Sequence, residues 1–206
     1  MGDYIAFLRG INLGRRRVKM EELRTLFEQL KFTRVTTFIA SGNVLFSDRT
    51  TDTDALRARI EQHLAKALGY SVDVFLRTPA EVAAMANLRP FADTDVAVPG
   101  HVVYSVMLHA PLPPAVQRKV LACATAVDHF RFVGRDLYWL CQIRSSDSTV
   151  WTSPQMRALK FPTNTMRNMN TIEKLHVLCG ANASVGKSVA KVVPMAKPRT
   201  RRSPKG

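Results

Sequence analysis

At 206 residues the chain is long enough for one large domain or two small ones, and 46% hydrophobic and 22% charged residues make an ordinary globular composition. No stretch approaches the roughly 20 apolar residues of a membrane-spanning helix, and residues 1–5 carry an acid where a secretion signal carries positive charge. Cys123, Cys141 and Cys179 are too widely spaced to indicate a disulfide framework or a metal site. We therefore expect a cytoplasmic protein with no membrane partner, no metal and no cofactor.

The formal net charge of +14 is unevenly distributed along the chain. Seven of the 30 basic residues and none of the 16 acidic residues lie in residues 181–206, which leaves +7 for the first 180 residues. This segment is rich in Ser, Pro, Gly and Ala and buries too little apolar surface to offset its ordering entropy, so we expect a disordered basic tail. Such a tail either binds nucleic acid or another anionic surface through counterion release, or has no specific partner.

Residues 1–77 contain six predicted elements. In chain order these are a strand at 4–8, a helix from Met20, strands at 35–40 and 44–46, a helix capped by Thr53 or Asp54 and ended by Gly69, and a strand at 72–76. The strands are short β-rich runs, whereas the apolar residues of the helices recur three and four positions apart. The order strand, helix, strand, strand, helix, strand predicts a ferredoxin-like βαββαβ unit.

Residues 78–180 predict a second α+β unit. The expected elements are a helix from Thr78 that ends before Pro90, a connecting loop at 91–100, a strand at 101–109, a helix at 115–126, a hairpin of strands 130–133 and 137–141, a short helix at 154–159 and a last helix capped by Asn170. Both faces of the first sheet are apolar, so this unit should pack over the face that the first two helices leave open. A distant structural duplication is one interpretation, although no internal sequence repeat supports it. The predicted fold class is therefore α+β, with two packed units and a basic tail.

The predicted topology places the loop after the first strand beside the hairpin at one edge of the first sheet. The candidate ligand-binding residues of this edge are Arg9, Gly10, Asn12, Gly14, Arg15, Ser41, Gly42 and Asn43. Glycines allow close approach of a ligand to the backbone, a helix start offers free N–H groups, and arginines provide planar donors, which together suit phosphate or carboxylate. In the alternative interpretation the glycines only shape the loop, the asparagines bond the backbone and the arginines point into water.

Recognisable catalytic motifs are missing from the sequence. It contains no HExxH zinc pattern, no GxSxG nucleophile elbow and no GxxxxGK[ST] phosphate loop. Ser41 has no histidine nearby in sequence that could activate it. The hairpin also lacks the RGFGFVxF pattern of RNA-recognition motifs. The sequence therefore names no catalytic residue and leaves open whether the protein is an enzyme.

Three separated motifs resemble those of a bacterial family known as domain of unknown function 1697. The segments YIAFLRGINLG at 4–14, FIASGNVLF at 38–46 and TMRNMNT at 165–171 are similar to its RGIN loop, its SGN hairpin and its TRNWNT motif. Arg15 stands where a second glycine is usual, and Met166 and Met169 replace the Thr and Trp of the last motif. The resemblance spans about residues 3–178 and implies an α+β fold with a ferredoxin-like part, without an established activity, cofactor or catalytic residue.

Two functional hypotheses follow. The first is a binding module for an anionic ligand, either a phosphorylated small molecule or nucleic acid, at the loop of residues 9–19 and the hairpin of residues 41–43, together with Arg167 and Asn168 of the third motif. The second is an enzyme of unrecognised type that acts on an anionic small molecule at the same edge. An oligomeric or scaffolding role is a third alternative.

Overall fold

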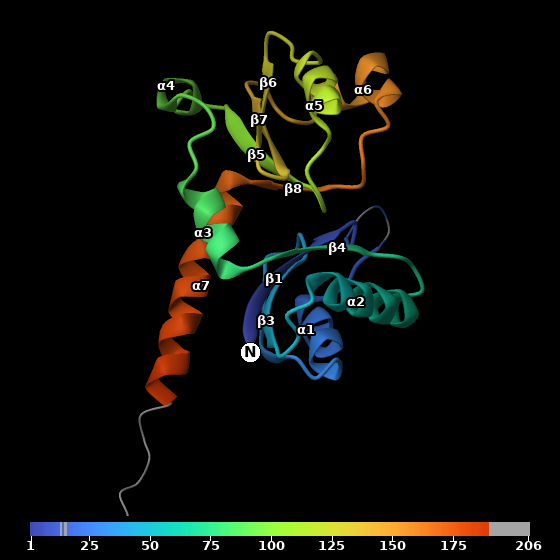
Figure 1. Cartoon of the computed structure of the whole chain (residues 1–206), viewed down its shortest axis with the longest axis vertical. Helices are drawn as coiled ribbons and strands as arrows, with labels where there is room; N and C mark the ends of the chain where they lie inside the picture. Colours follow the sequence, from blue (N-terminus) through green and yellow to red (C-terminus); the bar gives the residue numbers. More distant parts are fainter. Residues whose placement is uncertain (13, 15, 190–206) are drawn as a thin grey trace, which may run out of the picture.

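The computed structural model describes residues 1–12, 14 and 16–189. This part of the chain forms two four-stranded antiparallel sheets, one above the other, with the long helix α7 (Met169–Val189) beside the lower one (Figure 1). The predicted α+β class is confirmed. Within the same ranges, no helix combines the length and the apolar character needed to cross a membrane.

The first 77 residues form the six predicted elements, in the predicted order. They are β1 (Gly2–Arg9), α1 (Met20–Gln29), β2 (Thr33–Phe38), β3 (Asn43–Asp48), α2 (Thr53–Leu68) and β4 (Asp73–Arg77). The strands lie in the order β2-β3-β1-β4, and every neighbouring pair is antiparallel. The predicted cap of α2 is wrong: Asp52 caps the helix, because its carboxylate accepts the backbone N–H groups of Asp54 and Ala55.

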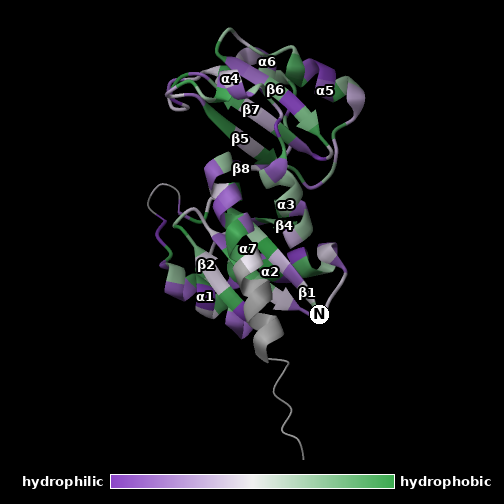
Figure 2. Cartoon of the chain, turned by 90° about the vertical axis from the view of Figure 1, so that its left-hand side faces the viewer, coloured by the Kyte–Doolittle hydropathy of each residue, from purple (hydrophilic) through white to green (hydrophobic). Residues whose placement is uncertain are grey.

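Both faces of the first sheet are buried. Alternate residues of β1 point to opposite faces, so that Ala6 and Leu8 pack under α1 and α2, while Ile5 and Phe7 face the other way. That second face is covered chiefly by α7 and by the helix that follows β4, α3 (Pro79–Asn87). Figure 2, seen from the side of α7, shows α7 lying across the first sheet.

The second unit contains the second sheet and the helices around it. Its elements are α4 (Asp93–Val96), β5 (Val102–Met107), α5 (Pro114–Leu121), β6 (Asp128–Val133), β7 (Asp136–Cys141), a 3-10 turn (Val150–Thr152), α6 (Pro154–Ala158) and β8 (Thr165–Asn168). The expected loop at 91–100 contains α4, α5 ends five residues earlier than predicted, and β8 had no sequence prediction. Asn168 rather than Asn170 caps α7, since its Oδ1 accepts the Thr171 N–H at 2.9 Å.

The backbone of α7 continues to Val189, past the predicted start of the basic tail at residue 181. Residues 190–206 of that predicted tail lie outside the described residues.

The two sheets share one topology. The second runs β6-β7-β5-β8, which is the order β2-β3-β1-β4 with each strand replaced by its counterpart in the second half of the chain. The registers also correspond, because Ile5 of β1 is paired with Arg77 of β4 and Ser105 of β5 is paired with Arg167 of β8. Strand order and register therefore support the structural duplication that the sequence left open. They also give Arg77 and Arg167 equivalent places on the last strand of each unit.

Candidate functional site

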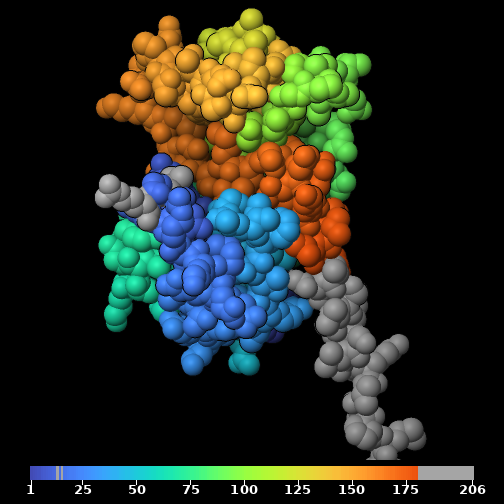
Figure 3. Space-filling model, turned by 180° about the vertical axis from the view of Figure 1, so that it is seen from behind, coloured from blue at the N-terminus to red at the C-terminus, as the bar shows by residue number. Residues whose placement is uncertain are grey.

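The loop after β1 and the hairpin between β2 and β3 lie side by side, as the predicted topology requires. The Leu8 N–H donates to the Gly42 carbonyl oxygen at 2.8 Å, and the Asn12 side-chain amide donates to the Ala40 carbonyl oxygen at 2.8 Å. Figure 3 shows the dark-blue loop at the boundary with the orange segment of the second unit. We call this place, formed by residues 9–19 and 41–43, the first edge.

Arg167 reaches the first edge from β8 and is almost fully buried there, with 8% of its surface exposed. Its Nε donates to Asn43 Oδ1 at 2.7 Å, and its Nη2 donates to the carbonyl oxygens of Leu8 at 2.9 Å and Ser41 at 2.7 Å. Burial lowers the pKa of Arg167 to about 10, so the guanidinium still carries its charge at pH 7. Arg167 therefore ties the second unit to the edge that the sequence singled out.

The candidate asparagines use their polar groups within the protein. Asn43 is 0% exposed, and its amide donates to the carbonyl oxygen of Phe38 at 3.0 Å and to Ser41 Oγ at 3.1 Å. Asn12 Oδ1 also accepts the Val18 N–H at 2.7 Å. Asn168 caps α7, so all three candidate asparagines make hydrogen bonds within the protein.

Among the candidate glycines, Gly42 is the most tightly confined. It has φ +78°, and a Cβ added there would lie 2.6 Å from Ile11 Cγ2 and 3.2 Å from Leu8 Cβ. Gly14 has a similar φ of +60°, but a Cβ there would meet no atom within 4 Å among the described residues. At Gly42 a side chain is therefore opposed by both a steric clash and the left-handed backbone, whereas at Gly14 it is opposed by the backbone conformation alone.

We expect Gly42→Ala to lower the free energy of unfolding by about 2–4 kcal/mol, because the methyl group adds a clash with Ile11 to the cost of the left-handed backbone. Gly14→Ala should cost only about 1 kcal/mol, the conformational part. Urea denaturation of both variants measures the difference. Equal losses in the two variants would contradict a close-packed hairpin.

The outer surface of the first edge carries exposed cations. They are Arg9, Arg16, Arg17 and Lys19; Arg15 lies outside the described residues. The Arg9 guanidinium forms an ion pair with Asp73 at 3.2 Å, and the Arg16 guanidinium lies 4.1 Å from the centre of the Tyr70 ring. Such exposed contacts leave most of the positive charge facing solvent.

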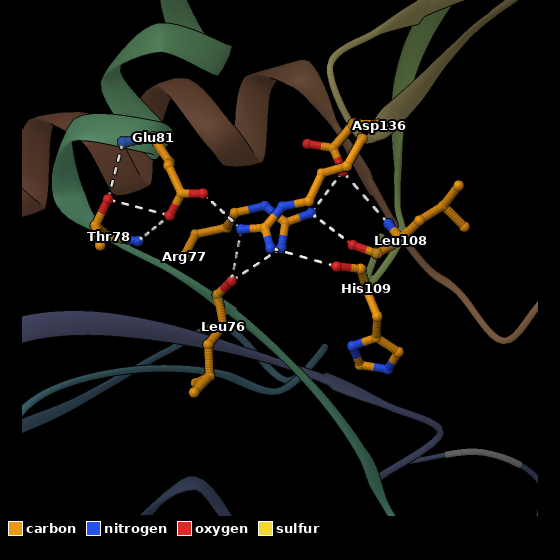
Figure 4. Close-up of polar contacts among 8 residues, drawn as sticks. Leu76, Arg77, Thr78, Glu81, Leu108, His109 and Asp136 are labelled. Carbon is orange, nitrogen blue, oxygen red and sulfur yellow. Dashed lines mark hydrogen bonds and ion pairs between the residues drawn. The ribbon is translucent and has the colours of Figure 1, made fainter. Parts of the chain in front are cut away.

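The second unit has an equivalent edge, which sequence reasoning missed. Arg77 is 2% exposed, its Nη2 donates to the Leu108 carbonyl oxygen at 3.1 Å, and it forms an ion pair with Asp136 (Figure 4). Leu108 directly follows β5 and Asp136 begins β7, just as Leu8 lies near the end of β1 and Asn43 begins β3. Each unit therefore sends an arginine from its last strand into the edge of the other, and we call the two arrangements the arginine clamps.

The two clamps differ in charge. Burial lowers the pKa of Arg77, and the neighbouring Asp136 carboxylate opposes that shift. Arg167 faces the amide of Asn43 instead, and no ion pair among the described residues includes it. A repeated pattern was present in the sequence: Arg77-Thr78 directly precedes α3 and Arg167-Asn168 directly precedes α7, each an arginine followed by a helix cap.

Two further features concern the reactive side chains of the described residues. No group of three or more side chains able to hold a metal ion occurs among the described residues. Burial raises the pKa of the Cys179 thiol to about 11 and raises that of Cys141, so neither is a thiolate at pH 7. The two clamps, by contrast, hold the guanidinium groups of Arg77 and Arg167 in fixed positions.

Comparison with known proteins gives a family and a fold. The family model described as protein of unknown function (DUF1697) matches residues 1–138. A conserved bacterial protein of Streptococcus pneumoniae, SP0830, has a similar structure, with a TM-score of 0.66 and 20% sequence identity over 86% of this chain and 98% of its own. No curated protein matches the sequence. The match covers more than half of the chain, and this protein therefore belongs to the DUF1697 family.

Proposed function

We propose that the protein is a binding module for an anionic ligand, and that the ligand binds at the first edge. The observation that carries the proposal is the charge of Arg167. Its counterpart Arg77 is neutralised by Asp136, whereas Arg167 is buried against carbonyl oxygens and the Asn43 amide. Burying a guanidinium without a carboxylate is costly, and an anion bound nearby reduces that cost.

The exposed side chains of the loop extend the same positive field outward. Arg16, Arg17 and Lys19 are exposed, and the acids nearest to them in sequence are Glu21 and Glu22 in the first turn of α1. Asn12 and Gly42 hold the loop in place behind these cations. In this proposal the buried polar residues are the scaffold, and the exposed arginines and lysine make contact with the ligand.

An extended polyanion suits this surface better than a compact one. The cations follow one another along an outer loop, so a ligand contacts them in series, as the phosphates of a nucleic acid strand do. Arg16, stacked on Tyr70, also presents a planar cation next to an aromatic ring, a combination that accommodates bases as well as phosphates. We therefore propose single-stranded nucleic acid as the ligand class. The test below also distinguishes it from a phosphorylated small molecule.

The test is the salt dependence of binding to a fluorescently labelled oligothymidine, measured by anisotropy. Each phosphate contact to a single strand contributes about 0.7 to the slope of log K against log salt, so Arg16→Gln with Arg17→Gln should reduce the slope by about 1.4. The matched control is Arg118→Gln with Lys119→Gln, which removes the same charge from exposed positions of α5. All variants are also made with the seven basic residues of 181–206 changed to glutamine, which separates the contribution of the loop to binding from that of residues 181–206.

Equal slope changes for the loop pair and the α5 pair would overturn the proposed edge. A salt-insensitive, stoichiometric affinity for a phosphorylated small molecule would keep the edge but replace nucleic acid as the ligand.

A further inference from the structure

A cavity lies at the second edge, on the boundary between the two units. Its volume is about 160 Å³, below the roughly 300–1,000 Å³ of pockets for drug-sized ligands. The charged and titratable residues of its lining are Asp54, Arg57, Arg77, Glu81, His109 and Arg135. The size admits a small ion, and the lining comes from β1 and α2, from the junction of β4 with α3, and from two loops of the second unit.

Three arginines contribute to the cavity, and they differ in how far their donors are used. Arg77 is occupied by Asp136 and two carbonyl oxygens (Figure 4). Arg135 is positioned by an ion pair of its Nη2 with Glu81. Arg57 is held more loosely. Its Nη2 pairs with Asp54 at 3.1 Å, and the side chain of Asp54 is 88% exposed to water.

The Nε atom of Arg57 is buried and has no hydrogen-bond partner among the described residues. A buried N–H without an acceptor costs about 1–3 kcal/mol, and native proteins contain few of them. An acceptor inside the cavity removes this cost. Since the donor belongs to a cation, the best acceptor is an anion.

His109 belongs to the same lining. Its ring lies parallel to that of Phe75 with 4.1 Å between their centres. Burial lowers the pKa of His109, and the charges of Arg57, Arg77 and Arg135 lower it further, while Asp73 opposes them. The acids that line the cavity, Asp54 and Glu81, are paired with Arg57 and Arg135 respectively.

We propose that this cavity binds a compact oxyanion of the sulfate or phosphate class, held by Arg57 and Arg135 beside the imidazole of His109. The N-termini of α2 and α3 reach the same cavity, but Asp52 already accepts the N–H groups of Asp54 and Ala55, and the Thr78 side chain accepts that of Glu81. Recognition therefore rests on the side chains. The site is separate from the first edge and needs residues of both units, so occupancy should also hold the units together.

The experiment adds sulfate to the full chain and uses the titration of His109 to report binding in the cavity. Sulfate keeps its charge between pH 5 and 8, so the titration of each histidine by NMR can be compared in sulfate and in chloride at equal ionic strength. A bound oxyanion close to the ring should raise the pKa of His109 by about one unit, in a saturable manner. His129, which lies outside the cavity lining, is the internal control.

Arg57→Gln tests the residue on which the proposal depends, and Lys66→Gln, an exposed residue of the same helix, is its matched control. The expected result is that Arg57→Gln abolishes the sulfate response of His109 and Lys66→Gln preserves it. An equal response of His109 and His129 in the unmodified protein, or an unchanged response in Arg57→Gln, would overturn the site. The comparison of the two histidines decides the question even if Arg57→Gln fails to fold.

Discussion

Arg167→Met is expected to lower the free energy of unfolding by about 3–5 kcal/mol, since it removes the donor from several buried acceptors at once. The carbonyl oxygens of Leu8 and Ser41 and the side-chain oxygen of Asn43 all depend on this guanidinium. Each buried acceptor left without a donor costs about 1–3 kcal/mol. The loss falls short of their sum, because removing a buried charge that has no carboxylate partner returns part of the energy.

Urea denaturation followed by circular dichroism measures this loss. Arg118→Met provides the control, because Arg118 is exposed on α5 and its replacement should change stability by no more than about 0.5 kcal/mol. Arg167→Lys keeps a charge but cannot reproduce the planar set of donors, so it should fall between Arg167→Met and the unmodified protein. A lysine variant as stable as the unmodified protein would mean that charge, not the geometry of the donors, holds the edge.

The sequence located the first edge correctly but could not assign the role of its polar residues. Short β-rich runs and helical spacing were enough to place β1, β3 and the loop between β1 and α1, which brings Asn12 and Asn43 together. The same residue types serve a ligand or the backbone equally well. Only the bonds of Asn43 to Phe38, Ser41 and Arg167 assign it to the fold.

The second half was less predictable for a different physical reason. β8 is four residues long and owes its extended form to pairing with β5, a tertiary contact that leaves no periodic pattern in the chain. The cavity at the second edge depends on Arg57, His109 and Arg135, which are brought together by the packing of two units. No spacing rule joins residues so far apart in sequence.

The two arginine clamps explain how a duplicated fold can carry two different edges. In both, an arginine of the last strand closes the edge of the other unit, so the pairing of the units is constrained twice. The partner at the start of the third strand is a carboxylate in one clamp and an amide in the other. The clamp arginine of the second edge is therefore paired with a carboxylate, whereas that of the first edge has only amide and carbonyl partners.

Asp136→Ala is expected to destabilise the protein by about 3–5 kcal/mol, because it leaves the buried charge of Arg77 without its partner. The same change removes the acceptor of the Leu108 N–H, which donates to Asp136 Oδ1 at 3.3 Å. Asp136→Asn should cost less, since the amide oxygen can still accept both bonds and imitates the arrangement of Asn43 with Arg167. Urea denaturation of the two variants gives their order.

A double-mutant cycle with Arg77→Met separates the ion pair from the rest of the clamp. Once Arg77 is neutral, removing Asp136 no longer strands a charge, so the double variant should be more stable than the sum of the single losses predicts, by at least about 1 kcal/mol. Additive losses would mean that each residue acts through its carbonyl and backbone bonds alone. In that event the carboxylate partner would not affect stability, and the absence of such a partner at Arg167 would no longer support an anionic ligand bound nearby.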